Sequence, residues 1–270
     1  MNERPALSAE RAAYLRKIRR ETLLVRGSRA AIVFVFFALW EIAADTGLID
    51  AFIMSSPSRI AATTARLAAE GNLFQHIGIT CMETVAGFLL GTVLGTAIAM
   101  LLWWMPRLAR IMEPILVVLN SLPKIALGPV FIVWMGPGVG AIVVMGLAIS
   151  LITTVLEVHH GFSCTDPDKI KLVESFGASR AQVLQKVVLP ENLPTIVNAL
   201  KVNVGLSWVG VIVGEYLVSK AGLGYLIVYG GQVFQLDLVM TGVIILALMA
   251  VGMYRCITLV ENRVLRGRRR

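Results

Sequence analysis

Residues 85–105 read VAGFLLGTVLGTAIAMLLWWM, with no charged side chain among them. An α-helix rises 1.5 Å per residue, so about 20 apolar residues cross a hydrocarbon core roughly 30 Å thick. A soluble protein would have to bury such a helix on every side. The stretch therefore predicts a transmembrane helix.

Other apolar runs of similar length occur along the chain, and none alternates like a membrane β-strand. Of the 270 residues, 57% are hydrophobic and 16% are charged, with a mean hydropathy of +0.76. This is more apolar material than a soluble core of that size buries. We predict an all-α polytopic membrane protein with six transmembrane helices in a domain of residues 29–262. The predicted spans are residues 29–49, 85–105, 115–135, 139–158, 195–217 and 238–258.

Basic residues cluster at the two ends of the chain, which has a net charge of +8. By the positive-inside rule, this places both termini in the cytoplasm, with residues 1–28 as an N-terminal arm and 263–270 as a basic tail. The polar segment 159–194 then also lies in the cytoplasm. A basic fringe on a membrane protein marks topology and contacts anionic lipid, so we expect membrane lipid as a partner and no nucleic acid.

Residues 50–83, between the first two spans, are too polar to cross a membrane. They contain Ser55-Ser56-Pro57-Ser58, a typical helix start. We predict a helix on the outer surface here.

Gly87, Gly91 and Gly95 recur at four-residue spacing in the second span. One helix face therefore lacks side chains, and a neighbouring helix can approach closely. We predict that these glycines serve helix packing rather than ligand binding.

The third span is interrupted near its middle by Asn120, Ser121, Pro123, Lys124 and Pro129. Each proline removes a backbone hydrogen bond. Broken helices are tolerated at membrane depth only where protein or a water-filled cavity satisfies the freed groups. We therefore expect this helix to lie at the translocation pathway.

Charged residues also occur in the fifth span, where Lys201 and Glu215 lie about four helical turns apart on one face. A charge at the centre of a spanning helix costs about 2.5–3.5 kcal/mol, so it should face protein or water. That face is predicted to look at the pathway or at a partner helix. Pairing with other polar groups that hold the bundle together is the alternative. The pathway candidates are Asn120, Pro123, Lys124, Lys201, Trp208 and Glu215.

The segment 159–194 divides into two short helices. Asp166 and Pro167 start the first, and Gly177 ends it. Ser179 caps the second, which Pro190 ends. The result is a helix-turn-helix lying across the membrane face.

The sequence contains no G-x-x-x-x-G-K-[ST] motif, so ATP would have to be bound by a partner. Cys81, Cys164 and Cys256 lack metal-site spacing, and no cluster of catalytic side chains stands out. We expect a protein that is not an enzyme and that binds no metal or cofactor itself.

The cytoplasmic segment reads KLVESFG at residues 171–177 and VVLP at 187–190. This resembles the coupling loop of bacterial ABC importer permeases, in which E-A-A-x-x-x-G is followed nine residues later by an aliphatic residue, any residue and Leu-Pro. The glycine and Leu-Pro match. Lys171, Leu172 and Val173 stand where the family has E-A-A, and Glu174 follows about one turn after the expected glutamate. The departure puts the usual glutamate contact in doubt.

Further matches resemble the nitrate/sulfonate/taurine branch of this family. They include Glu113-Pro114, Trp208, Glu215 and Gly222-Leu223-Gly224, and the resemblance covers roughly residues 40–262. It implies a type I ABC importer permease fold with a cytoplasmic coupling helix. The coupling residues that it implies are Lys171, Glu174, Gly177, Ala178, Leu189 and Pro190.

The resemblance also implies partners and a location. These are two ATPase subunits that use ATP-Mg, a second permease copy forming a homodimer, and a periplasmic or lipid-anchored solute-binding protein. The location implied is the bacterial inner membrane, and the cargo is a small anionic solute such as nitrate, a sulfonate or taurine, or a related organic compound. An ion-coupled secondary transporter is the alternative, since interrupted helices also occur there. Such transporters are typically built from internal repeats, and we find none in this sequence.

Overall fold

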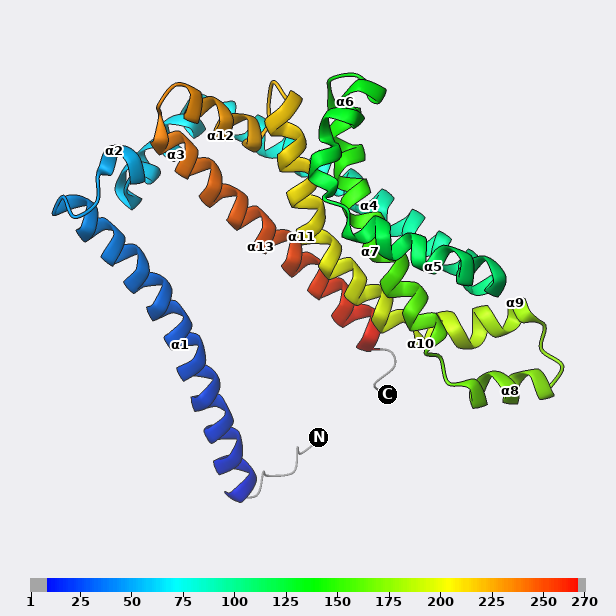
Figure 1. Ribbon diagram of the computed structural model, residues 1–270. Helices are drawn as coiled ribbons and strands as arrows, with labels where there is room; N and C mark the ends of the chain where they lie inside the picture. Colours follow the sequence, from blue (N-terminus) through cyan, green and yellow to red (C-terminus); the bar gives the residue numbers. More distant parts are fainter. Residues whose placement is uncertain (1–8, 267–270) are drawn as a thin grey trace.

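The computed structural model describes residues 9–266, and over that range every regular element is a helix (Figure 1). This confirms the all-α class. Residues 1–8 of the predicted arm and residues 267–270 of the predicted tail lie outside the described residues. The helices are α1 (Ala9–Asp45), α2 (Ala51–Met54), α3 (Pro57–Ala69), α4 (Asn72–Trp104), α5 (Pro106–Ser121), η1 (Lys124–Leu127), α6 (Gly128–Met135), α7 (Val139–Ser163), α8 (Pro167–Ser175), α9 (Arg180–Val183), η2 (Leu184–Val188), α10 (Leu189–Glu191), α11 (Leu193–Val218), α12 (Leu223–Gln232) and α13 (Leu236–Arg266).

Five helices are long and apolar enough to cross a membrane singly, namely α1 over Lys17–Asp45, α4, α7, α11, and α13 over Leu236–Arg263. The segments Pro106–Ser121 and Lys124–Met135 meet this criterion only together, and they are bent by 86° at the break between them. Taken as one broken span, the pair brings the number to six. The multi-pass prediction is therefore confirmed.

The second span begins earlier than its sequence suggests. The prediction that residues up to 83 lie in the outer connection is wrong, because α4 already begins at Asn72. Its polar residues, among them Thr80 and Glu83, are buried against neighbouring helices. Polarity therefore does not keep this part of the chain out of the bundle. The predicted helix start is present, since α3 begins at Pro57 with Ser56 as its N-cap.

Helices α4, α7 and α11 form the centre of the bundle. Gly87, Gly91 and Gly95 of α4 all face α7. A Cβ atom added at Gly95 would lie 2.6 Å from Cβ of Thr154, closer than side chains approach one another. The missing side chains allow the two helices to pack tightly.

The same three helices share a second close contact and a buried polar group. A Cβ atom at Gly210 of α11 would lie 2.6 Å from Cα of Gly146 on α7. About two helical turns away on α11, Nδ2 of the buried Asn203 donates to the hydroxyl of Thr92 at 3.2 Å and to that of Thr154 at 2.5 Å. Because this amide bonds to both α4 and α7, it fixes the register of the three helices.

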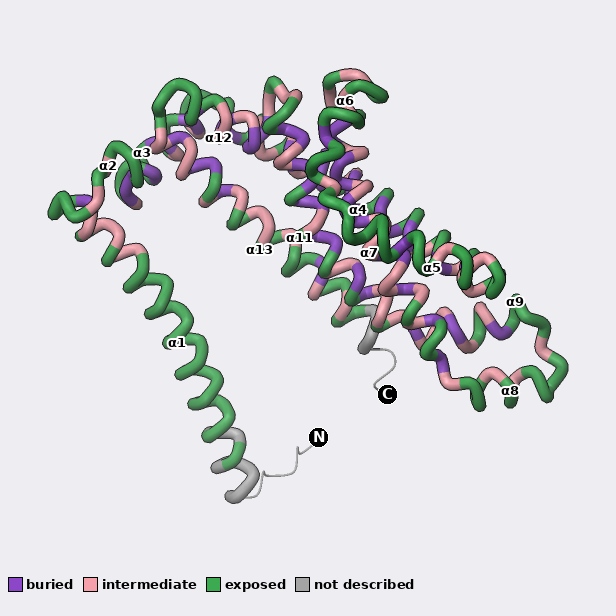
Figure 2. The backbone as a smooth tube through the Cα atoms, in the orientation of Figure 1, coloured by how far each residue is buried: buried purple, intermediate pink, exposed green. Residues whose placement is uncertain are grey.

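Helix α1 stands apart from this bundle (Figure 1). It runs without a break from the predicted arm through the first span. None of its spanning window is buried, and Figure 2 shows it exposed along most of its length. Within the single chain, α1 contacts only α2 and α3 to any extent. Its apolar side chains are therefore available to lipid or to another copy of the chain.

Candidate coupling site and translocation pathway

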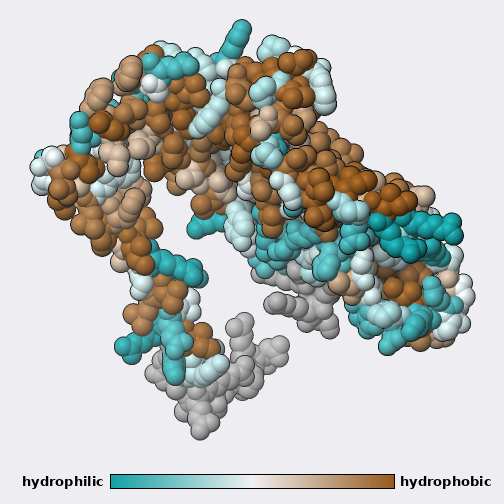
Figure 3. All heavy atoms as spheres, viewed as in Figure 1, coloured by the Kyte–Doolittle hydropathy of each residue, from teal (hydrophilic) through white to brown (hydrophobic). Residues whose placement is uncertain are grey.

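Residues 166–191, which we call the coupling hairpin, project beyond the ends of α7 and α11 (Figure 1). Asp166 caps α8 by accepting from the amide of Asp168 at 2.9 Å. Ser179 forms a capping box with Gln182 at the start of α9. Both helix starts lie where the sequence predicts them. Figure 3 shows hydrophilic residues gathered at this end of the molecule.

Gly177 turns the chain between the two arms of the hairpin. Its φ of +82° is left-handed, a conformation that glycine adopts without strain. Its amide donates to the carbonyl of Glu174 at 2.8 Å, and the amide of Ala178 donates to that of Val173 at 3.3 Å. These two bonds form a Schellman motif, which ends α8.

The prediction that Pro190 ends the second helix is wrong. The helical path continues through Pro190 to Glu191, because the turn before it widens into a π-helix over Leu184–Val188. The amide of Leu189 donates to the carbonyl of Leu184, five residues back. Proline removes a hydrogen bond and crowds the carbonyl four residues earlier, and a wider turn relieves that clash.

One side of the hairpin is anchored to the bundle. Ala178 and Leu189 pack against a buried cluster that includes Phe162, Val183 and Val188. Leu189, which matches the Leu-Pro part of the coupling-loop pattern, therefore anchors the hairpin to the bundle.

Arg180 adds a second anchor that sequence reasoning missed. Its guanidinium lies 5.4 Å from the ring centre of Trp103 and 5.7 Å from that of Trp104, and it donates to the Trp103 carbonyl at 3.2 Å. Two adjacent tryptophans at the end of an apolar run, with an arginine in the following loop, are a signal that could have suggested a cation–π contact.

The opposite side of the hairpin carries an exposed apolar pair. Leu172 on α8 and Phe176, the C-cap residue of that helix one turn later, are 58% and 81% exposed. Lys171 lies beside them and is also exposed, with its Nζ 3.4 Å from Oδ1 of Asp168. Glu174 lines a hollow of about 710 Å³ between the hairpin and the ends of α4, α5 and α7. Aromatic and aliphatic side chains exposed beside charged ones are typical of a protein interface.

A groove of about 490 Å³ runs between α8 and the π-helical turn and is partly lined by Pro190. Nζ of Lys169 bridges it by an ion pair to Glu191 at 2.7 Å. The hydrogen bond to Glu191 raises the pKa of Lys169 above its usual value. The pair is exposed and contributes little to stability, but it links the two arms of the hairpin.

The break in the third span places Asn120, Pro123 and Lys124 together. Nζ of Lys124 donates to the backbone carbonyl of Asn120 at 2.9 Å and to its side-chain oxygen at 3.2 Å. The same amide oxygen lies 3.5 Å from the hydroxyl of Thr153 on α7. The lysine thus satisfies a carbonyl that the broken helix leaves free, and it stays accessible beside the bend.

Lys201 and Glu215 are predicted to lie on one face of α11, but they contact different helices. Lys201 pairs with Glu261 of α13 at 2.5 Å. Glu215 is 1% exposed and turns toward the start of α12. Trp208 is also buried, packed between α4 and α13. Of the candidates on α11, Trp208 and Glu215 are therefore buried, whereas Lys201 stays partly exposed, as does Lys124 at the break in the third span.

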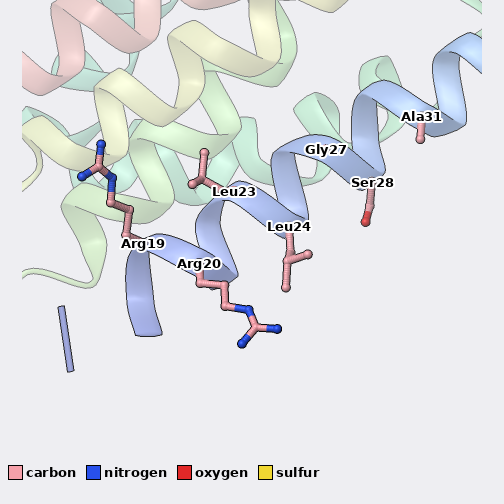
Figure 4. Close-up of a pocket in the computed structure, with 7 residues that line it drawn as sticks. All are labelled: Arg19, Arg20, Leu23, Leu24, Gly27, Ser28 and Ala31. Atoms are coloured by element: carbon pink, nitrogen blue, oxygen red, sulfur yellow. The ribbon is translucent and has the colours of Figure 1, made fainter. Parts of the chain in front are cut away.

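A further hollow of about 600 Å³ lies along α1, and all seven residues that line it come from this one helix (Figure 4). Arg19 and Arg20 lie near one end of it and Ala31 at the other. A hollow with walls from a single helix has no opposite side to enclose a solute. It marks the unpartnered face of α1 rather than a ligand site.

An all-helical bundle of helices long and apolar enough to span a membrane, one of them broken, with an anchored hairpin at one end, defines a multi-pass membrane protein. The sequence profile described as "Binding-protein-dependent transport system inner membrane component" matches residues 87–267. The chain belongs to this family. It is therefore an inner-membrane component of a transport system that works with a binding protein.

Relatives and a solved structure agree with this assignment. The chain is 29% identical over 235 residues to the putative aliphatic sulfonates transport permease protein SsuC of Bacillus subtilis, covering 87% of this chain and 85% of that protein. It is 28% identical over 236 residues to the formylaminopyrimidine transport permease protein ThiX of Halalkalibacterium halodurans, covering 87% and 94%. An inward-facing structure of the MetNI methionine ABC transporter superposes with a TM-score of 0.63 at 21% identity, covering 74% of this chain and 97% of that one. The last match shows a shared fold, the type I importer permease fold.

Proposed function

We propose that this chain forms the translocation pathway of an ABC importer and that the coupling hairpin docks on a separate ATPase. The observation that carries the proposal is the hairpin itself. One side is fixed to the bundle by Arg180 and by the packed Ala178 and Leu189. The other side presents Leu172 and Phe176 to solvent. A rigid element exposed in this way can transmit movement of a partner into α7 and α11.

The cargo we propose is a small anionic solute. Lys124 supports this, because it places an accessible cation beside the break in the third span. The similarity to a putative aliphatic sulfonate permease points the same way, whereas the similarity to a formylaminopyrimidine permease names the competing cargo class. Neither ATP-Mg nor any other cofactor is bound by this chain in our proposal, and the ATPase supplies the hydrolysis.

The assembly we propose contains two ATPase subunits, a solute-binding protein and a second copy of this permease. The face of α1 supports the second copy, because its apolar residues are unpartnered within one chain. In this assembly, lipid covers the apolar surface of α1 that the second copy leaves exposed.

Phe176→Ala should weaken ATPase association, because a large aromatic side chain leaves the centre of the interface. We expect a loss of about 1 kcal/mol, roughly fivefold in affinity, measured by co-purification and titration of the ATPase. Lys171→Glu should weaken it further if the ATPase groove offers an acidic partner. The matched control is Phe234→Ala. Phe234 is also highly exposed, at 72%, but it lies on the turn before α13, at the end of the molecule away from the coupling hairpin. Loss of association in the control, with none in Phe176→Ala, would contradict the docking site.

The proposed topology places both termini and the coupling hairpin in the cytoplasm. Reporter fusions after Glu70, Thr165 and Gly230 should read outside, inside and outside, because residues 70 and 230 flank spans at the end opposite the hairpin. An outside signal at Thr165 would exclude the six-span arrangement.

A further inference from the structure

The start of α12 is held by side chains from other helices. The first amides of a helix have no partner within it, and Gly222 at the N-cap has no side chain to offer. Instead, the amide of Gly222 donates to Nδ1 of His76 at 2.8 Å. The amide of Leu223 donates to the hydroxyl of Thr80 at 2.7 Å. Both acceptors belong to α4.

Glu215, in the last turn of α11, serves the next amide. Its Oε2 accepts from the amide of Gly224 at 2.5 Å. The amide of Tyr225 and the Thr80 hydroxyl are further donors close to this carboxyl group. Donors at the N-terminus of a helix favour a negative charge, so Glu215 is the better placed of the two buried carboxyl groups at this corner to hold one.

Glu83 of α4 lies against Glu215 without any such donors. It is 3% exposed, and neither of its carboxyl oxygens has a hydrogen-bond partner among the described residues. Oε1 of Glu215 also lacks a donor there. Glu83 lies one turn after Thr80 on α4, and Thr80 and Glu215 hold successive amides at the start of α12, so this packing brings the two buried carboxyl groups together. Ionised carboxylates only accept, so a bond between them requires a proton on one of the two.

We propose that Glu83 is a neutral carboxylic acid that donates to the ionised Glu215, so that the pair forms a buried proton-binding site joining α4 and α11 at the start of α12. Two adjacent buried negative charges would repel each other and lose their hydration, and one proton removes both costs.

The other titratable groups near the pair do not provide the missing cation. His76 accepts at Nδ1, so that nitrogen carries no proton. Cys81 and Tyr216 approach Glu215, but neither can carry a positive charge. Among the described residues, no group of three or more His, Cys, Asp or Glu side chains is arranged to hold a metal ion. The proton is the cation that fits.

Glu83→Gln tests the site, because glutamine keeps the shape and supplies an N–H donor that does not titrate. In the purified full-length chain, infrared spectroscopy should show a carboxylic acid band at neutral pH that Glu83→Gln removes. The folded state holds a proton that an unfolded glutamate releases near pH 4.3, so thermal stability of the wild type should fall as pH rises from about 4.3 through neutral. Glu83→Gln should lack this dependence, so it should match the wild type near pH 4 and exceed it at neutral pH.

Two further variants complete the test. Glu83→Ala leaves Oε1 of Glu215 without a donor, so its unfolding midpoint should be lower than that of the wild type near pH 4, where protonating Glu83 costs nothing. Glu70→Gln, at the exposed end of α3, should leave both the band and the pH dependence unchanged. A band that persists in Glu83→Gln, or is absent from the wild type, would overturn the proposal. So would a wild-type stability that follows sodium concentration rather than pH. None of these readouts measures transport, so their failure leaves the proposed function standing.

Discussion

Gly177→Val abolishes uptake while the chain still folds and inserts; this is the result we expect for the turn of the coupling hairpin. A Cβ atom at this position meets nothing within 4 Å, so the effect comes from the backbone alone. At a φ of +82°, a β-branched residue is strained by about 1–2 kcal/mol or more. The chain relieves the strain by shifting Phe176 and Ala178, and we expect roughly 5- to 30-fold weaker ATPase association.

Gly177→Asn is the matched control, because asparagine is the residue that most readily replaces glycine after a helix. It should keep most of the uptake and of the ATPase association. Both variants should give the same amount of membrane-inserted protein. Normal uptake by Gly177→Val, with undiminished association, would show that this turn does not transmit ATP-driven movement.

Gly210→Ala should destabilise the bundle by about 3 kcal/mol, the upper part of the range for overpacked cores. The new Cβ atom would lie 2.6 Å from Cα of Gly146 and 2.9 Å from its amide nitrogen. These are backbone atoms, so they cannot rotate away as a side chain would. Helices α7 and α11 must separate, which also lengthens the bonds of Asn203. The measurement is the thermal unfolding midpoint of the detergent-purified chain.

Gly205→Ala on the same helix is the matched control, since a Cβ atom there meets nothing within 4 Å. Both substitutions raise helix propensity by about 0.5–1 kcal/mol, so the difference between them isolates the close approach of the helices. Gly205→Ala should be as stable as the wild type or slightly more so. Equal midpoints for the two variants would refute the packing argument.

The hydrophobic runs were sufficient to predict the class of the fold, because spanning helices must be apolar over their whole length. They predicted the start of α4 badly, because His76, Thr80 and Glu83 read as polar when taken alone. Their partners are amides and a carboxyl group about 140 residues further along the chain. A local window of hydropathy contains no information on such long-range bonds.

The coupling hairpin could likewise be predicted only in part from the sequence. Asp166, Gly177 and Ser179 were predictable because capping and turn chemistry is local. The π-helical turn before Pro190 was not, since proline by itself indicates a helix end. The contact of Arg180 with Trp103 was missed because it joins elements far apart in sequence. The different partners of Lys201 and Glu215 depend on how α12 and α13 surround α11, which helical spacing does not determine.

Helix α1 is continuous over its whole length, so it can move as one rigid rod. At 1.5 Å per residue its 37 residues extend about 55 Å, well beyond a hydrocarbon core of roughly 30 Å. In the proposed topology, we therefore expect its N-terminal part, with Lys17, Arg19 and Arg20, to extend past the hydrocarbon core, where anionic lipid can bind basic side chains. A rigid rod that tilts in the membrane moves its two ends in opposite directions. Lipid bound to the N-terminal part of α1 should therefore restrict the tilt of the helix, and with it the movement of its C-terminal end relative to α2 and α3.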